Sequence, residues 1–133
     1  MDNMTLEATR KQFITVVLCE PGKEAYVTTI SNDLESLQKT VGGYIEAVYP
    51  FDDPVAIIWN EEGKLNATEL NRALRDDLGQ IYDILAGPFF VAGLSDDNFA
   101  SLSKDLQVKY CQIFKHPELF FWDGNQIRVI SLD

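Results

Sequence analysis

Two pairs of adjacent carboxylates, Glu61-Glu62 and Asp76-Asp77, are the residues that first suggest acid–base chemistry. A carboxyl group can act as a general acid or base when burial raises its pKa toward neutrality. Both pairs lie in segments rich in turn residues, however, and adjacent acids in turns usually face water. We therefore predict that neither pair is catalytic.

His116 is the single histidine of the chain, and histidine is the residue type whose ordinary pKa lies nearest neutrality. It precedes Pro117 at the end of an expected helix, where an imidazolium can stabilise the last backbone carbonyls. Ser101 and Cys111 are candidate nucleophiles, but neither has a recognisable histidine and acid around it. We expect no catalytic residue, and the sequence favours a non-enzymatic protein.

Metal and phosphate sites also find little support. A structural zinc site needs about four Cys or His ligands at close spacing. The chain contains only three such residues, Cys19, Cys111 and His116. Asp52-Asp53-Pro54 lacks the spaced oxygen ligands of a calcium loop, and Val41–Tyr44 lacks the Lys-Ser/Thr ending of a phosphate loop. We expect two small buried cysteines without a disulfide, no metal and no cofactor.

The composition is that of one acidic globular domain. The 133 residues are 46% hydrophobic and include 11 basic and 21 acidic residues, so the formal net charge is −10. Such a chain repels phosphate backbones, which disfavours direct nucleic-acid binding. No run approaches the roughly 20 apolar residues of a membrane span, and the first residues lack the apolar centre of a signal peptide. A cytoplasmic location is expected.

The acidic residues are concentrated in the middle of the chain. Residues 44–83 contain nine acids and three bases. They can form a solvated rim of turns, or a surface that imitates phosphates and occupies a basic groove on another protein. The residues proposed for this acidic surface are Glu46, Asp52, Asp53, Asp76 and Asp77.

A polar motif beside this acidic segment is the candidate binding site. Its residues are Asn60, Glu61, Glu62, Lys64, Asn71, Arg72 and Asp83. The alternative is a structural role, in which Asn60 satisfies turn amides and Gly63 takes a positive φ. Arg72 would then pair with one of the nearby acids, Glu61, Glu62 or Asp83.

Hydrophobic patterning predicts the elements that must position these residues. Apolar or β-branched runs indicate strands at 13–19, 25–30, 44–49, 55–59 and 126–130, and a longer extended run over 80–93. One helix is expected to begin at Asn32, acting as its cap, and to end at Gly42-Gly43. A second helix is expected from Ser103 to His116. Leu65–Arg75 fits a short strand or one or two helical turns, and we favour the helix.

These elements predict an α+β fold: a small, mostly antiparallel sheet of about five to six strands with two main helices. Residues 1–11 are expected to be a flexible N-terminal segment, and 12–133 a single domain. Gly87-Pro88 is expected to mark a bulge or bend. Asp123-Gly124 is expected to form a hairpin turn before the last strand.

Four motifs occur in a distinctive order, and together they resemble a known family. They are Val-Gly-Gly-Tyr-Ile-Glu from Val41, Asn-Glu-Glu-Gly-Lys-Leu from Asn60, Asn-Arg-Ala from Asn71 and Tyr-Asp-Ile-Leu-Ala-Gly from Tyr82. The chain resembles a small uncharacterised domain family of Gram-positive bacteria, their phages and their conjugative elements. The resemblance covers residues 12–94, and 95–133 resembles a helical C-terminal extension. It implies an accessory protein of a mobile element.

Our first hypothesis is a non-enzymatic, acidic accessory protein that binds a host protein with a basic surface and inhibits a defence system. The alternative is a small-molecule or nucleotide-signal binder that sequesters its ligand. A third alternative is a hydrolase in which acidic residues hold a metal loosely. The residues proposed for the nucleotide site are the stacking aromatics Tyr44, Tyr49, Trp59, Tyr82 and Phe89, with polar contacts from Asn60, Lys64, Asn71 and Arg72.

Overall fold

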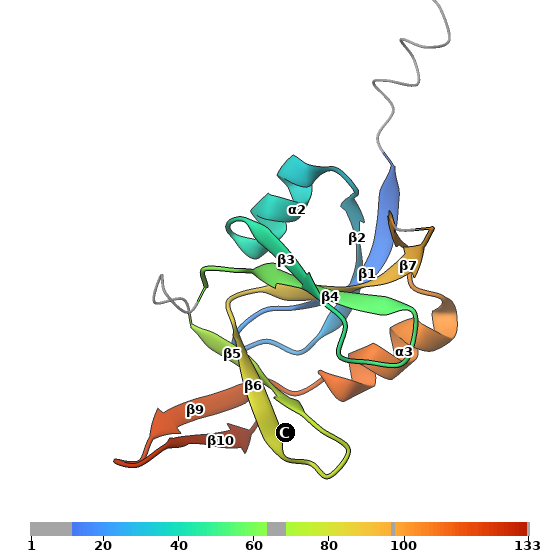
Figure 1. Cartoon of the computed structure of the whole chain (residues 1–133). Coiled ribbons are helices and arrows are strands. Elements are labelled where there is room, and N and C mark those ends of the chain that lie inside the picture. Colours follow the sequence, from blue (N-terminus) through green and yellow to red (C-terminus); the bar gives the residue numbers. More distant parts are fainter. Residues whose placement is uncertain (1–11, 64–68, 97, 133) are drawn as a thin grey trace, which may run out of the picture.

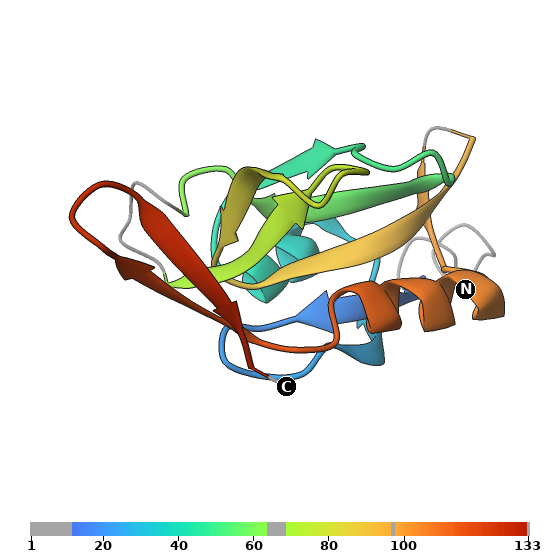
Figure 2. The ribbon, with the colours of Figure 1, turned by 90° about the horizontal axis from the view of Figure 1, so that it is seen from below.

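A curved antiparallel sheet forms the centre of the molecule (Figures 1 and 2). The computed structural model describes residues 12–63, 69–96 and 98–132, so the N-terminal segment expected to be flexible lies outside the described residues. The strand order is β2-β1-β7-β4-β3, and a short strand, β8, pairs with β7. The strands are β1 (Phe13–Cys19), β2 (Tyr26–Ser31), β3 (Ile45–Val48), β4 (Val55–Asn60), β7 (Phe89–Ser95) and β8 (Asn98–Ala100).

The central strands are apolar on both faces because a helix covers each face. In β4 four consecutive residues, Val55–Ile58, are fully buried. Helix α2 (Leu34–Val41) packs Leu37 and Val41 against one face. Helix α3 (Lys104–Ile113) and the residues that follow it cover the other. No helix in the described ranges is long and apolar enough to cross a membrane.

Two hairpins lie outside the central sheet. β5 (Leu70–Arg75) pairs with β6 (Ile81–Ala86), and β9 (Glu118–Trp122) pairs with β10 (Ile127–Ser131), each as a two-stranded antiparallel sheet. The β9–β10 hairpin projects away from the rest of the molecule (Figure 2). Gly87, at φ 74°, and Pro88 end β6, so that β7 enters the central sheet while β6 stays outside it.

The predicted fold class is therefore correct only in outline. Antiparallel pairing and two helices are confirmed for the described residues. The expectation of a single sheet of five to six strands is wrong, because the ten strands in the described ranges form three sheets. The domain is a largely β fold with few helices. The sequence predicts the bend at Gly87-Pro88, but it does not predict that this bend separates two sheets.

The helical turns favoured for Leu65–Arg75 are wrong for the part that the structure describes. Residues 70–75 form strand β5, while 64–68 lie outside the described residues. All four residues from Asn71 to Leu74 are buried, and the β5–β6 register shifts near both ends of the strand. These irregularities hide the alternation typical of a strand. Tertiary packing has overridden a mild helical propensity here.

The helix ends follow side-chain chemistry, with one correction. Asp33, not Asn32, caps α2, because its carboxylate accepts the Ser36 N–H at 2.9 Å. Asn32 instead extends the β1–β2 ladder, and its side chain donates to the Phe99 carbonyl. Gly42 ends α2 with φ 83°, as predicted, and Ser103 caps α3.

Asp53 ties the β3–β4 loop to α3. Its Oδ2 accepts a hydrogen bond from the Tyr110 hydroxyl at 2.7 Å and forms an ion pair with Lys109. These contacts, Lys109 first, lower the pKa of Asp53 below its ordinary value. Burial and the bond to Asp53 raise the pKa of Tyr110, so this hydroxyl stays a donor.

We predict that Asp53→Asn reduces the acid sensitivity of the fold. A carboxyl whose pKa is lower in the folded state stabilises the protein above the unfolded-state pKa, about 3.9, and this contribution disappears as the pH falls. Urea unfolding at pH 7 should show a less stable variant, and the stability gap to wild type should narrow toward pH 3. Asp52→Asn, which removes the neighbouring carboxyl, is the control. Parallel pH profiles for wild type and Asp53→Asn would contradict this role.

Candidate functional site

A rigid turn at the end of β4 presents the first half of the predicted polar motif. Asn60 is buried, and its Oδ1 accepts the Glu62 N–H at 3.0 Å. Its carbonyl accepts the Gly63 N–H, also at 3.0 Å, while the Glu61 N–H donates to the Tyr44 carbonyl at 3.1 Å. The expectation that Asn60 satisfies turn amides is confirmed. The turn is thereby fixed to the residue that precedes β3.

Two glycines surround Asn60 because there is no room for a side chain. A Cβ on Gly43 would lie 2.7 Å from Asn60 Nδ2, and one on Gly63 would lie 3.0 Å from the Ala86 carbonyl oxygen. The expected positive φ at Gly63 is wrong, since Gly63 is not among the described glycines with φ above zero. Close approach, and not backbone conformation, requires glycine there.

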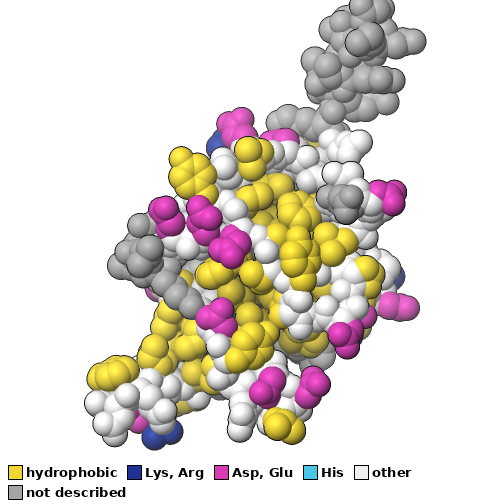
Figure 3. Space-filling model, viewed as in Figure 1, with side chains coloured by type: hydrophobic (Ala, Val, Ile, Leu, Met, Phe, Trp, Pro, Cys, Tyr) yellow, Lys and Arg dark blue, Asp and Glu magenta, His cyan; other side chains and the backbone are white. Residues whose placement is uncertain are grey.

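Around this turn lies a surface that we call the acidic-aromatic patch, formed by Tyr44, Glu46, Glu61 and Glu62. Tyr44 is 65% exposed, and the three carboxylates are exposed as well. None of these carboxylates forms an ion pair with a Lys or Arg of the described ranges. Figure 3 shows acidic side chains gathered beside the start of β3, next to hydrophobic ones. The patch combines carboxylates that no described Lys or Arg neutralises with an aromatic ring.

The other predicted acidic residues divide into exposed and internally bonded groups. Asp52 and Asp77 are exposed. Asp53 is engaged by α3, and Asp76 Oδ1 accepts the N–H groups of two residues within the β5–β6 turn, each at 2.9 Å. Asp83 lies half-buried on β6 and accepts the N–H of its neighbour Ile84. Of the predicted acidic surface, Asp53 and Asp76 are thus engaged in bonds within the protein, although Asp76 is also exposed.

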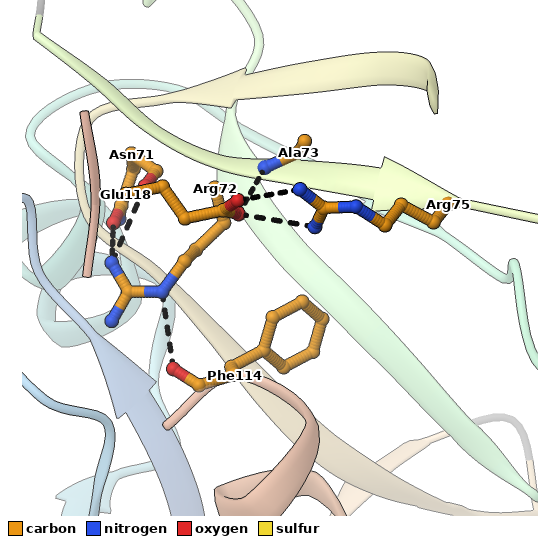
Figure 4. Close-up of polar contacts among 6 residues, drawn as sticks. All are labelled: Asn71, Arg72, Ala73, Arg75, Phe114 and Glu118. Atoms are coloured by element: carbon orange, nitrogen blue, oxygen red, sulfur yellow. Dashed lines mark hydrogen bonds and ion pairs between the residues drawn. The ribbon is translucent and has the colours of Figure 1, made fainter. Parts of the chain in front are cut away.

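The second half of the predicted motif is a buried polar cluster on β5. Arg72 is 1% exposed and makes four hydrogen bonds. Figure 4 shows those to Asn71 and Phe114. Nε donates to the Phe114 carbonyl at 3.0 Å, Nη2 to the Lys23 carbonyl at 2.6 Å, and Nη1 to Asn71 Oδ1 at 2.7 Å. Asn71 Nδ2 in turn donates to the carbonyls of Cys19 and Gly87.

The expected ion pair between Arg72 and Glu61, Glu62 or Asp83 is therefore wrong. Backbone carbonyls and one amide satisfy the guanidinium, and burial lowers its pKa from the ordinary value. Nothing in the sequence marks a carbonyl as the acceptor, because every residue carries one. Asn71 and Arg72 hold segments of the fold together, and the structure does not bring them to the acidic-aromatic patch. Lys64 lies outside the described residues.

Glu118 is the important residue that the sequence analysis missed. Its Oε1 accepts the Ala73 N–H at 2.9 Å, and its Oε2 pairs with Arg75 at 2.6 Å (Figure 4). The carboxylate thereby satisfies an N–H on β5 and fastens the β9–β10 hairpin to that strand. The signal that could have shown it is an acid at the start of an otherwise apolar run, Glu118–Trp122.

The residues proposed for nucleotide stacking do not gather at one place. Phe89 is fully buried in the core, whereas Tyr44 and Tyr49 are exposed beside β3. Tyr82 and Arg72 do line a shared cavity, but its volume is about 210 Å³. Binding sites for drug-sized ligands usually enclose about 300–1,000 Å³. With its donors engaged inside the protein, Arg72 is poorly placed to bind a phosphate.

Both cysteines are free thiols, as predicted. Burial raises the pKa of Cys19 to about 12, so this thiol stays protonated and weakly nucleophilic. Burial also raises the pKa of the half-buried Cys111. Within the described ranges, no group of three or more His, Cys, Asp or Glu side chains is placed to hold a metal ion.

We predict that Gly43→Ala and Asn60→Ala are strongly coupled. Gly43→Ala should lower the free energy of unfolding by about 1–3 kcal/mol, because the added methyl overlaps the Asn60 amide. In an Asn60→Ala background the obstruction is gone, so the same change should cost about 1 kcal/mol less. Chemical denaturation of the four proteins of the cycle measures this difference. Strictly additive effects would show that the two residues do not constrain each other.

We predict that Arg72→Met destabilises the protein far more than Arg75→Met. Loss of Arg72 leaves several buried acceptors unpaired, and the free energy of unfolding should fall by about 3 kcal/mol or more. Arg75 is partly exposed, and its buried partner Glu118 would keep the Ala73 N–H as a donor, so loss of this one ion pair should cost about 1–2 kcal/mol. Thermal and urea unfolding compare the two variants. Equal decreases in the free energy of unfolding would show that the buried cluster stabilises the fold no more than the Arg75–Glu118 ion pair does.

Comparison with family models shows that residues 14–115 match DUF3846, a domain of unknown function. The matched region begins in β1 and ends just after α3. It includes both the Asn60 turn and the Asn71–Arg72 cluster, and it extends past residue 94, where the family-like core was expected to end. Comparisons with curated proteins and with solved structures give no match. The chain therefore belongs to the DUF3846 family.

Proposed function

We propose that this domain acts without catalysis, by binding a protein partner through the acidic-aromatic patch. The observation that carries the proposal is the display of three exposed carboxylates and one exposed tyrosine on the fixed Asn60 turn and the adjoining start of β3. A preorganised surface loses little conformational entropy when a partner binds. Tyrosine is among the side chains enriched at energetically important positions of interfaces.

The charge of the patch indicates the chemistry of the partner. The carboxylates of Glu46, Glu61 and Glu62 favour a basic surface, and the net charge of −10 adds a long-range attraction toward cations. The same charge repels nucleic acid. Because exposed charges are screened over about 8 Å at physiological ionic strength, binding should weaken as salt rises.

The proposed biological setting rests on the sequence resemblance. A cytoplasmic accessory protein of a phage or mobile element would meet host proteins that carry basic, nucleic-acid-binding grooves. An acidic protein that occupies such a groove would compete with the nucleic acid. Inhibition of a host defence system is the form of this competition that we propose.

We predict that neutralising the patch removes partner binding. The bait variant carries Glu46→Gln, Glu61→Gln and Glu62→Gln, and the control carries Glu35→Gln, Asp96→Asn and Asp105→Asn, three exposed acids on other elements. The two variants have the same net charge. A host protein captured by wild type and by the control, but not by the patch variant, is then purified for titration at several salt concentrations.

The expected result is a dissociation constant that rises at least tenfold for the patch variant and rises with ionic strength for wild type. Equal loss in both variants would indicate a response to net charge alone. Equal retention in both would place the interface elsewhere. Either outcome would contradict the proposed patch.

A further inference from the structure

The outer edge of β2 presents backbone groups that have no partner strand among the described residues. The Asn32 N–H donates to the Gln12 carbonyl at 2.7 Å, directly across the β1–β2 ladder. The Ala25 N–H points the opposite way and donates to the Lys115 carbonyl at 3.1 Å. Because alternate residues of an edge strand face toward and away from their partner, Val27 and Thr29 present their N–H and C=O groups outward.

This edge lacks the features that normally prevent a strand from pairing further. β2 has the sequence Tyr-Val-Thr-Thr-Ile-Ser, without charge, proline or a register shift against β1. The opposite edge, β3, has only four residues, carries Glu46 and is followed by Pro50. Short length, charge and proline are the usual protection of edge strands. The sheet is protected at β3 and open at β2.

A groove runs between this open edge and α3. Its volume is about 460 Å³, and its walls include Val27 from β2 with Val108 and Cys111 from α3. Val27 is 42% and Val108 67% exposed, so the groove has apolar surface that nothing in the described ranges covers. Val27 pairs across the ladder with Val17, whose side chain belongs to the core on the α3 side. An added strand would therefore place alternate side chains against α3.

Two lysines mark the ends of the groove. Lys104 stands at the start of α3 and Lys115 just after its end, and both line the groove. Neither forms an ion pair within the described ranges. At 1.5 Å per residue they are separated by roughly 16 Å, the length of about five strand residues. Glu24 also lines the groove, so its two lysines and one carboxylate leave a small net positive charge on an acidic protein.

We propose that the β2 edge and the α3 groove bind an extended segment of a partner protein, which adds a strand to the sheet. Its backbone would bond to Val27 and Thr29, its apolar side chains would cover Val108, and acidic side chains near its ends would meet Lys104 and Lys115. This is β-strand addition, in which main-chain bonds give affinity and alternate side chains give specificity. The site is separate from the acidic-aromatic patch and does not depend on it.

A second copy of the chain fits the groove less well. Two β2 edges paired about a twofold axis would bring the two α3 helices, and with them their unpaired lysines, to the same face of a shared sheet. An acidic strand from another protein meets the lysines with opposite charge.

The test uses the full-length protein, isotope-labelled for NMR, and a capped synthetic peptide, Glu-Thr-Val-Thr-Val-Thr-Glu. In an extended conformation this peptide places both glutamates and both valines on one face. Titration to roughly 1 mM should shift the amide signals of β2 and of the groove face of α3, with saturation. The control peptide has lysine in place of both glutamates and should bind at least tenfold more weakly.

Two protein variants locate the binding. Thr29→Pro removes an outward N–H but no bond to β1, so the protein should stay folded and lose the peptide. Lys104→Glu with Lys115→Glu changes only exposed side chains and should favour the lysine peptide. Lys39→Glu, on α2 across the sheet, should bind as wild type does. Thr28→Pro removes an N–H that faces β1, and its lower melting temperature would confirm the alternation.

Shifts confined to β2 and α3 that disappear in Thr29→Pro and reverse preference in the double lysine variant would support the proposal. No saturable shifts, shifts elsewhere, or shifts unchanged in both variants would overturn it. A concentration-dependent dimer that Thr29→Pro abolishes would also overturn it, since the occupant would then be a second copy. Because the acidic-aromatic patch is unaltered in every variant, failure here would leave the proposed function untouched.

Discussion

The buried guanidinium of Arg72 is the constraint on which the arrangement of the domain depends. With Asn71 it contacts carbonyls from the end of β1, the β1–β2 turn, the β6–β7 bend and the residue after α3. A buried cation is tolerable only when its hydrogen-bonding groups are satisfied. Because these acceptors come from four separate segments, the charge favours the one arrangement that brings all four to the same point. The β5–β6 hairpin is held against the central sheet by polar bonds as well as by hydrophobic contact.

The same β5 strand fastens the remaining hairpin through Glu118, which accepts the Ala73 N–H. Polar groups inside this domain are therefore used for assembly, and the exposed polar groups lie elsewhere. The Asn60 turn separates the two roles within a few residues: the amide faces inward, and Glu61 and Glu62 face solvent. A motif that reads as one polar cluster in the sequence thus divides into a framework and a surface.

Much of the local structure could be predicted from the sequence because short-range chemistry decides it. Gly42 ends a helix, Ser103 begins one, and Asp123-Gly124 turns between two strands, as expected. Sheet membership could not be predicted, since it depends on how Gly87 and Pro88 direct the chain. The role of Arg72 was missed for a related reason: charge pairing can be guessed from residue types, but a carbonyl acceptor has no signature in the sequence. The sequence draws attention to Gly43 and Gly63 but suggests a conformational reason for them. The actual reason is close packing against Asn60 and Ala86, which depends on the tertiary structure.

The β9–β10 hairpin lies largely beyond the family region, which ends at residue 115, and six of its large apolar side chains in and after the two strands are 44–66% exposed. Its attachment to the body relies on one carboxylate at its base and on contact with β5. Because Glu118 supplies the polar attachment at its base, the hairpin can diverge in length and sequence beyond that point without disturbing the core, provided that this acid is retained. Variation among relatives should therefore accumulate at the tip of this hairpin, while Glu118, or an equivalent acceptor, persists at the junction.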